Sequence, residues 1–210
     1  HIGALIASGL EIVPVVAKPK VTIIPTGNEL VGTVAELKPG SILDVNSHML
    51  AAAVTGWGAT VRRHNIVSDD FIQLSEAVSA ALAESDMVIV NAGTSAGTED
   101  FTVKVLEKLG QVLVHGVAIK PGKPVVLALC DGKPVIGLPG YPVSAMLTAD
   151  LFVRPVLEGR QNFPIYESQT KDAVSTRQIY SHIGVEEYIR VSLGHVRGKT
   201  VAAPLGRGAG

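Results

Sequence analysis

The sequence predicts a three-layer α/β fold, in which a mostly parallel sheet lies between helices, followed by the start of a small all-β subdomain. Short apolar, β-branched runs alternate with helical patterns between residues 21 and 158, which is typical of a parallel sheet covered on both faces. After Arg160 the pattern changes to short alternating stretches separated by glycine and polar turns. We therefore expect an α/β domain over residues 21–158 and a partial β subdomain over residues 159–210.

Residues 1–20 precede this domain, and we expect them to form the end of a preceding subdomain and an extended linker. The apolar opening IGALIASGLEIV is too short to span a bilayer, and Pro14 and Pro19 interrupt the segment between it and the first strand. The chain begins with His1 rather than methionine and stops in the glycine-rich PLGRGAG. We therefore expect a piece of a longer protein.

The first half of the α/β domain alternates strands and helices. The run VTIIPTG predicts a buried strand over residues 21–27 that ends in a loop. Apolar positions with helical spacing follow Asp44, a suitable cap, and continue to residue 58. The next strand is expected over residues 59–67. A helix then runs to about residue 83, with Ser68, Asp69 and Asp70 as its capping residues.

The second half of the domain contains a hairpin and a last helix. An apolar strand over 86–93 enters a glycine-rich loop, and a helix follows over 100–109. The pair Asp131-Gly132 predicts a hairpin of strands 124–130 and 133–139. Pro142 suits the first turn of a helix over 141–158. In the β subdomain, strands are expected in the stretches AVSTRQIYS, EEYIRVSLGHV and KTVAAPL.

The composition excludes several classes of protein. Of 210 residues, 47% are hydrophobic and 18% are charged, which is unlike a disordered chain. Eighteen basic residues balance nineteen acidic ones, which argues against a protein that binds nucleic acid mainly through phosphates. The one cysteine, Cys130, excludes an intramolecular disulfide framework and a zinc finger, and its apolar strand predicts a core position. No apolar run is long enough to span a bilayer.

The first candidate binding loop lies between a strand and a helix. Gly93, Thr94, Ser95 and Gly97 follow the strand at 86–93, and ligands of open α/β sheets bind at such strand ends. Hydroxyl groups and helix N-terminal amides favour an anion there. The spacing is not that of a Walker A or dinucleotide-binding motif. The alternative is an ordinary turn in which Asp100 caps the next helix.

Two further loops combine rigidity with polar groups. Lys120 and Lys123 lie three residues apart between prolines, so both ammonium groups can face one anion; the alternative is a solvent-exposed basic turn. A Pro-Gly turn before the last helix also favours an anion, and an ordinary rigid turn is the alternative. The candidate binding residues of this turn are Pro139, Gly140, Pro142 and Ser144.

Acidic side chains lie near the ends of the predicted strands. Glu29, Asp69 and Asp100 are placed to share one rim of the sheet, where carboxylates can hold Mg²⁺ beside a phosphate. Helix capping is the alternative for Asp44 and Asp69. The six histidines lack the spacing of metal ligands.

Six segments carry a resemblance to a known family: PTGNEL (25–30), GSILDVNSHML (40–50), SDD (68–70), NAGTSAGTEDF (91–101), VAIKPGKP (117–124) and GLPGYPVSA (137–145). Together they resemble the MoeA family of molybdopterin molybdenumtransferases, which includes the gephyrin E domain. The sequence departs from the family pattern at Ala92, Gly116 and Tyr141. The family's N-terminal subdomains are missing, so this fragment alone is expected to lack part of the active site.

The resemblance implies a molybdopterin-binding fold shared with MogA-like adenylyltransferases and a role in molybdenum cofactor biosynthesis. Members insert molybdate into adenylylated molybdopterin, release AMP and need a divalent cation, here Mg²⁺. The resemblance further implies a cytoplasmic protein with small-molecule substrates, which is a homodimer at full length and has no nucleic-acid or membrane partner.

By the same resemblance, Lys120 and Lys123 bind the oxyanion, while Glu29, Asp69 and Asp100 are catalytic and candidate metal ligands. The implied substrate-binding residues are Gly93, Thr94, Ser95, Gly97, Pro139, Gly140, Pro142 and Ser144. Two alternatives remain, namely a molybdopterin adenylyltransferase and a non-catalytic binding or scaffold module of the same fold. Molybdate and tungstate are too similar for these motifs to distinguish.

Overall fold

The computed structural model describes residues 1–92, 98–164 and 170–206, with only the helical backbone at 98–100. Its centre is a six-stranded sheet in the order β4–β1–β5–β9–β8–β6. The first four of these strands are parallel, and β8 pairs antiparallel with both of its neighbours, β9 and β6. The strands are β1 (Lys20–Thr26), β4 (Thr60–Arg63), β5 (Met87–Ala92), β6 (Gln111–His115), β8 (Val126–Cys130) and β9 (Lys133–Leu138).

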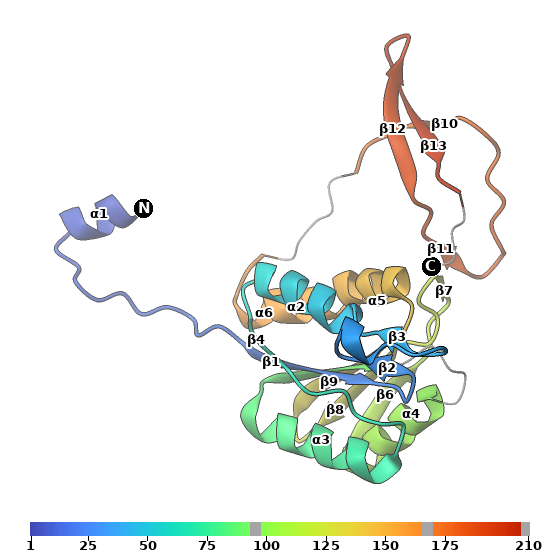
Figure 1. Ribbon diagram of the computed structural model, residues 1–210. Coiled ribbons are helices and arrows are strands. Elements are labelled where there is room, and N and C mark those ends of the chain that lie inside the picture. The colour runs from blue at the N-terminus through green and yellow to red at the C-terminus, as the bar shows by residue number, and fades with distance from the viewer. Residues whose placement is uncertain (93–97, 165–169, 207–210) are drawn as a thin grey trace.

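Helices cover both faces of this sheet, so the predicted three-layer α/β fold is confirmed (Figure 1). One face carries α3 (Phe71–Glu84) and α4 (Thr98–Leu109). The other carries α2 (Asn46–Gly56), α5 (Pro142–Thr148), the π-helical turn η2 (Ala149–Val153) and α6 (Arg154–Arg160). The predicted last helix is thus formed by α5, η2 and α6 in direct succession, with a π-helical turn in the middle. Pro155 lies just after this turn, and its missing N–H and bulky ring disturb the regular hydrogen bonding.

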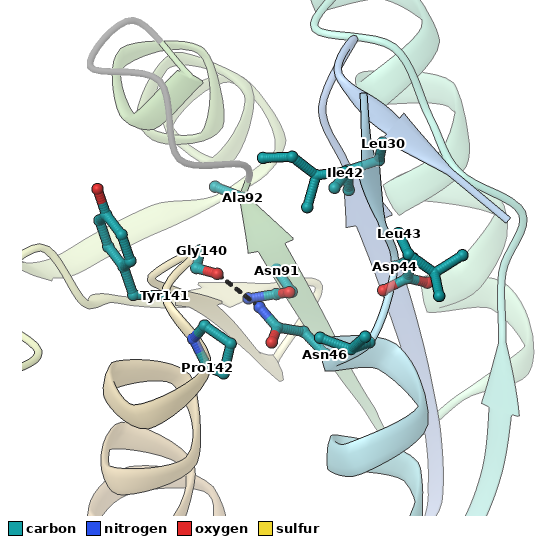
Figure 2. Close-up of a pocket in the computed structure, with 11 residues that line it drawn as sticks. Leu30, Ile42, Leu43, Asp44, Asn46, Asn91, Ala92, Gly140, Tyr141 and Pro142 are labelled. Atoms are coloured by element: carbon teal, nitrogen blue, oxygen red, sulfur yellow. Dashed lines mark hydrogen bonds between the residues drawn. The ribbon is translucent and has the colours of Figure 1, made fainter. Parts of the chain in front are cut away.

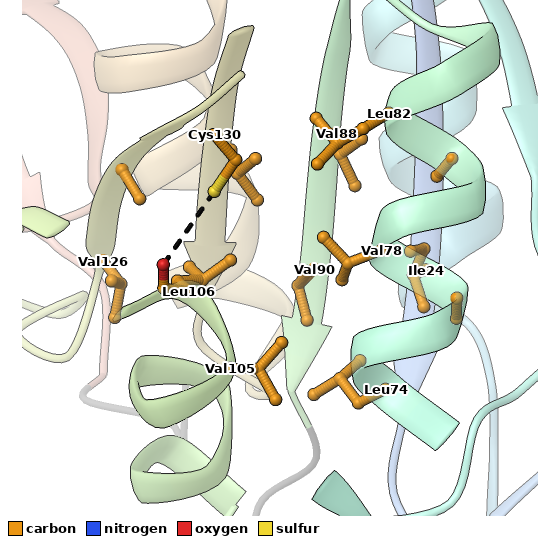
Figure 3. Close-up of a cluster of buried hydrophobic side chains, with 14 of the residues drawn as sticks. Ile24, Leu74, Val78, Leu82, Val88, Val90, Val105, Leu106, Val126 and Cys130 are labelled. Atoms are coloured by element: carbon orange, nitrogen blue, oxygen red, sulfur yellow. Dashed lines mark hydrogen bonds between the residues drawn. The ribbon is translucent and has the colours of Figure 1, made fainter. Parts of the chain in front are cut away.

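Each helical layer has its own apolar core. On the side of α3 and α4, Val78 and Leu106 pack with Val88 and Val90 of the central strand β5 (Figure 3). Cys130 lies in this core, with its sulfur 4.0 Å from the carbonyl oxygen of Leu106. Burial raises the pKa of the Cys130 thiol. The cysteine is therefore a core residue, as its apolar strand predicted.

Local interactions explain where the elements begin and turn. Asp131 and Gly132 adopt φ angles of 51° and 71°, which gives the tight hairpin turn between β8 and β9 that the sequence predicted. The helix expected after the capping residues 68–70 begins at Phe71, because the Asp70 carboxylate accepts hydrogen bonds from the N–H groups of Ile72 and Gln73. Of the three expected capping residues, only Asp70 caps α3; Asp69 turns toward β1.

Short elements lie outside the three layers. β2 (Leu30–Val31) and β3 (Ile42–Leu43) form a two-stranded sheet after β1, with the 3₁₀ turn η1 (Val34–Glu36) between them. α1 (Ile2–Ala7) is separated from β1 by residues without helix or strand. In Figure 1, α1 lies apart from the sheet. None of the helices in the described parts of the chain has the length and apolarity needed to cross a bilayer.

The C-terminal segment forms the small all-β unit that the sequence predicted. β12 (Val191–Val196) and β13 (Lys199–Pro204) make an antiparallel hairpin, and β10 (Val174–Ser175) pairs in parallel with β13. The stretch EEYIRVSLGHV is not one strand, because β11 (Glu186–Glu187) leaves the hairpin to pair with β7 (Ile119–Lys120). This pairing joins the C-terminal segment to the lysine loop of the α/β domain.

Candidate functional site

Three of the candidate loops follow strands that are neighbours in the sheet. β1, β5 and β9 are adjacent and parallel, so their carboxyl ends lie at the same edge. The loop after β1 contains Glu29, and the loop after β9 contains Pro139 and Gly140. The loop after β5 contains Gly93, Thr94, Ser95 and Gly97, which lie outside the described residues, as does the side chain of Asp100.

Asp69 is held against the end of β1. Its carboxylate accepts hydrogen bonds from the Thr26 hydroxyl (3.1 Å) and the Asn28 N–H (3.4 Å). In return, the Asp69 N–H donates to Asn28 Oδ1 (3.1 Å). Because Asp70 provides the cap of α3, the Asp69 side chain is available for this cross-link. The structure thus places Asp69 at the sheet edge where the sequence predicted an acidic group.

The charge of Glu29 acts on Asp69. Burial and then the nearby Glu29 carboxylate raise the pKa of Asp69, and the hydrogen bonds from Thr26 and Asn28 partly offset this rise. The Glu29 side chain also folds back over Gly27, where an added Cβ would lie 3.0 Å from Glu29 Oε2. Two carboxylates at one edge repel each other, and a cation or a proton between them reduces that repulsion.

The predicted metal site of three acids is described only in part. Glu29 follows β1 and Asp69 is hydrogen-bonded to the end of β1, while the Asp100 side chain lies outside the described residues. Among the residues that are described, no three His, Cys, Asp or Glu side chains form a metal-binding group. The oxygen donors that are present suit a hard cation such as Mg²⁺, which keeps several waters and takes one or two carboxylates.

The lysine loop contacts the C-terminal segment. Lys120 Nζ lies 3.7 Å from Glu187 Oε1, and the Glu187 side chain is 5% exposed. The same oxygen lies 3.0 Å from His182 Nδ1. Lys123 is exposed. Sequence reasoning missed Glu187, because the pairing of β11 with β7 joins residues that lie far apart in the chain.

The lysine loop also packs closely on α5. Gly122 has a φ angle of 108°, and an added Cβ would lie 2.5 Å from Thr148 Cγ2. The Thr148 hydroxyl donates to the Ser144 carbonyl one turn earlier (2.7 Å). Ser144 and Thr148 are both buried. The lysine loop and the Pro-Gly loop are therefore attached to the same short helix.

The Pro-Gly loop borders a cavity of about 240 Å³ (Figure 2). Gly140, Tyr141 and Pro142 form one wall, and residues of β2, β3 and α2 form the opposite wall. Of the candidate residues, Gly140 and Pro142 line this cavity, whereas Pro139 and Ser144 do not. Neither Lys120 nor Lys123 lines it.

Two asparagines that the sequence analysis did not single out hold the Pro-Gly loop in place. Asn46 Nδ2 donates to the Gly140 carbonyl (2.7 Å), as Figure 2 shows. Asn91 Nδ2 donates to the Pro139 carbonyl (2.9 Å) and approaches the Leu138 carbonyl (3.4 Å). Both asparagines lie within segments that carried the family resemblance, DVN and NAG, which was the available signal.

Comparison with known proteins points to one family. A family model described as a probable molybdopterin binding domain matches residues 22–159. The chain is 32% identical over 210 residues to molybdopterin molybdenumtransferase 2 of Mycobacterium tuberculosis, covering 96% of this chain and 51% of that protein. It is 34% identical over 205 residues to molybdopterin molybdenumtransferase of Bacillus subtilis, covering 97% and 48%.

Solved structures agree with these relatives. The molybdopterin biosynthesis MoeA protein from Pyrococcus horikoshii OT3 matches with a TM-score of 0.76 and 28% identity, covering 99% of this chain and 49% of that chain. The chain therefore spans about half the length of the relatives it matches.

Proposed function

The chain belongs to the family of the probable molybdopterin-binding domain, and on that premise we propose that it is the molybdopterin-binding half of a molybdopterin molybdenumtransferase. The resemblance to the MoeA family that the loops indicated is confirmed by these relatives. The observation that carries the proposal is structural: Glu29 and Asp69 lie at the carboxyl end of β1, the Pro-Gly loop follows β9 at the same edge of the sheet, and the lysine loop packs on α5, the helix that follows the Pro-Gly loop.

The proposed reaction joins molybdate to adenylylated molybdopterin and releases AMP. Lys120 and Lys123 supply positive charge for the molybdate dianion, and the packing of Gly122 on Thr148 fixes their loop relative to α5. Glu29 and Asp69, with Asp100 as a third acid, are the proposed ligands of Mg²⁺. When bound, this ion supplies Lewis-acid polarisation of the phosphate link.

The protein's part in this chemistry is binding and orientation. Fixed cationic and N–H donors stabilise charge that develops on oxygen without having to reorganise during the reaction. No side chain is proposed as a covalent nucleophile.

We also propose that the full-length protein is a cytoplasmic homodimer. Large apolar side chains such as Ile12 (85% exposed) and Val15 (84% exposed) are available for contacts with further subdomains.

The direct test is an AMP-release assay on the full-length protein with adenylylated molybdopterin and Mg²⁺. The proposal predicts that AMP appears when molybdate is added and does not appear when molybdate is omitted. Equal release in both conditions contradicts it. Formation of adenylylated molybdopterin from ATP and molybdopterin contradicts it too, because that reaction belongs to the alternative adenylyltransferase.

A further inference from the structure

Two buried amide side chains control the direction of consecutive carbonyls in the Pro-Gly loop. Asn46, the first residue of α2, is 7% exposed, and Asn91 in β5 is 2% exposed. Asn46 donates to the Gly140 carbonyl and Asn91 to the Pro139 carbonyl. The two donors come from different elements, so the loop is held from two directions.

Because the peptide bond is planar, the direction of each carbonyl also fixes the direction of the N–H group that follows it. In a trans peptide, the carbonyl of one residue and the N–H of the next point in opposite directions. Since the Pro139 carbonyl faces Asn91, the Gly140 N–H points away from Asn91. Likewise, the Tyr141 N–H points away from Asn46. Neither N–H has an acceptor within the described part of the chain.

The Asn46 amide is not itself satisfied. Among the described residues, its buried Oδ1 atom has no hydrogen-bond partner, while its Nδ2 atom is 2.7 Å from the Gly140 oxygen. A buried acceptor without a partner costs about 1–3 kcal/mol. Rotating the amide would place Oδ1 against the Gly140 oxygen, so rotation does not relieve this cost. Fold stability alone therefore does not account for an asparagine here.

We propose that Asn46 and Asn91 are positioning residues that orient the Gly140 and Tyr141 N–H groups toward a tetrahedral oxyanion of the substrate. This inference rests on the proposed function for the identity of the substrate. The oxyanion is either molybdate or a phosphate group, since both present the same acceptor oxygens. The asparagines act through the loop and do not touch the anion.

The first test observes the two N–H groups directly. The chain, labelled with ¹⁵N, is titrated with sodium molybdate and separately with inorganic phosphate, and backbone amide signals are followed by NMR. The inference predicts that the Gly140 and Tyr141 signals shift with at least one of the two anions. Shifts with phosphate alone support the inference and assign the loop to a phosphate group. It is overturned if neither signal moves with either anion.

The second test separates positioning from stability. Asn46→Leu removes both the Nδ2 donor and the unpartnered Oδ1, so the thermal unfolding midpoint is expected to change little. Affinity for the oxyanion is expected to fall about tenfold, as for the loss of a hydrogen bond to a charged group. Asn46→Asp retains the shape without the donor and should weaken binding at least as much.

The matched control is Asn162→Asp, which adds the same charge at an exposed asparagine after α6 and should leave binding unchanged. Unchanged affinity in a folded Asn46→Leu or Asn46→Asp variant overturns the inference. The proposed function fails on a separate readout, AMP release in the full-length protein, so the two can be told apart.

Discussion

Asp69 and Asp70 are adjacent residues with different roles. The Asp70 carboxylate caps α3, while the Asp69 carboxylate reaches back to Thr26 and Asn28 at the end of β1. If α3 began one residue earlier, Asp69 rather than Asp70 would be placed to cap it. Sequence reasoning named both as caps, because either acid satisfies the local capping preference. Sequence reasoning also placed Asp69 at the rim of the sheet, and its contact with β1 shows that Asp70, not Asp69, is the cap.

The raised pKa of Asp69 predicts a dependence of stability on pH. Above the unfolded-state value of 3.8, the folded state holds this proton more tightly than the unfolded state. The free energy of unfolding contributed by Asp69 is therefore lost as the pH rises from 3.8 through the raised folded pKa. Asp69→Asn removes this loss and retains an acceptor for Thr26, so we expect a smaller decline in stability toward neutral pH.

Urea unfolding measured from about pH 4 to about pH 7 tests this prediction. Asp70→Asn is the matched control, since asparagine caps helices about as well as aspartate. If the Asp69→Asn variant shows the same decline as the wild type, the environment described for Asp69 is wrong.

At the scale of elements, the junction between α4 and β6 depends on a close backbone approach. An added Cβ on Gly110 would lie 2.1 Å from the Leu129 carbonyl oxygen and 2.7 Å from Cys130 Cα, both in β8. These are backbone atoms of a strand in the central sheet, so they cannot move aside without disturbing the pairing of β8 with β6 and β9.

We therefore expect Gly110→Ala to lower the free energy of unfolding by about 2–4 kcal/mol. Gly159→Ala in α6 is the control, because nothing lies within 4 Å of an added Cβ there and alanine favours a helix. In urea titrations, the free energy of unfolding should be lower than that of the wild type for Gly110→Ala and higher for Gly159→Ala. Equal stabilities would show that β6 does not pack against β8 as described.

The elements that could be predicted from sequence are those with strong local patterns. β1, β5, β8 and β9 are apolar or bounded by turn residues, and the Asp131-Gly132 turn is specific to a hairpin. β6 was not predicted, because it is an outer antiparallel strand with polar residues at both ends. β2, β3, β7 and β11 are two residues long and owe their existence to distant partners.

In the candidate site, too, residues in local motifs could be predicted from sequence, and residues that act through distant contacts could not. The family segments pointed to the lysine, Pro-Gly and acidic loops, and the positions of Glu29 and Asp69 follow from strand order. Glu187, Asn46 and Asn91 required the structure, because each acts through a contact between elements that are distant in the chain.

At the scale of the whole molecule, the C-terminal segment contributes a residue to the lysine loop. The Glu187 carboxylate lies beside Lys120 and reduces the positive potential that an anion meets there. We expect Glu187→Gln to raise the affinity of the chain for molybdate by a few-fold, since partly exposed ion pairs are worth up to about 1 kcal/mol.

The adjacent Glu186 provides the control for this prediction. Its carboxylate accepts a hydrogen bond from the Tyr188 hydroxyl (2.7 Å) and is not paired with Lys120, so Glu186→Gln should change molybdate affinity less. Equilibrium dialysis of both variants measures the difference. A larger gain for Glu186→Gln than for Glu187→Gln would rule out the Lys120–Glu187 contact as the cause.

The central claim is that the lysine loop binds the molybdate used in a molybdenum-transfer reaction. The most direct measurement is molybdate-dependent AMP release by the full-length protein carrying Lys120→Ala and Lys123→Ala. A second protein carrying Lys18→Ala and Lys199→Ala loses the same charge at exposed positions away from the loop. The account predicts that release is abolished in the first protein and retained in the second. Unchanged release in the first protein would contradict the account.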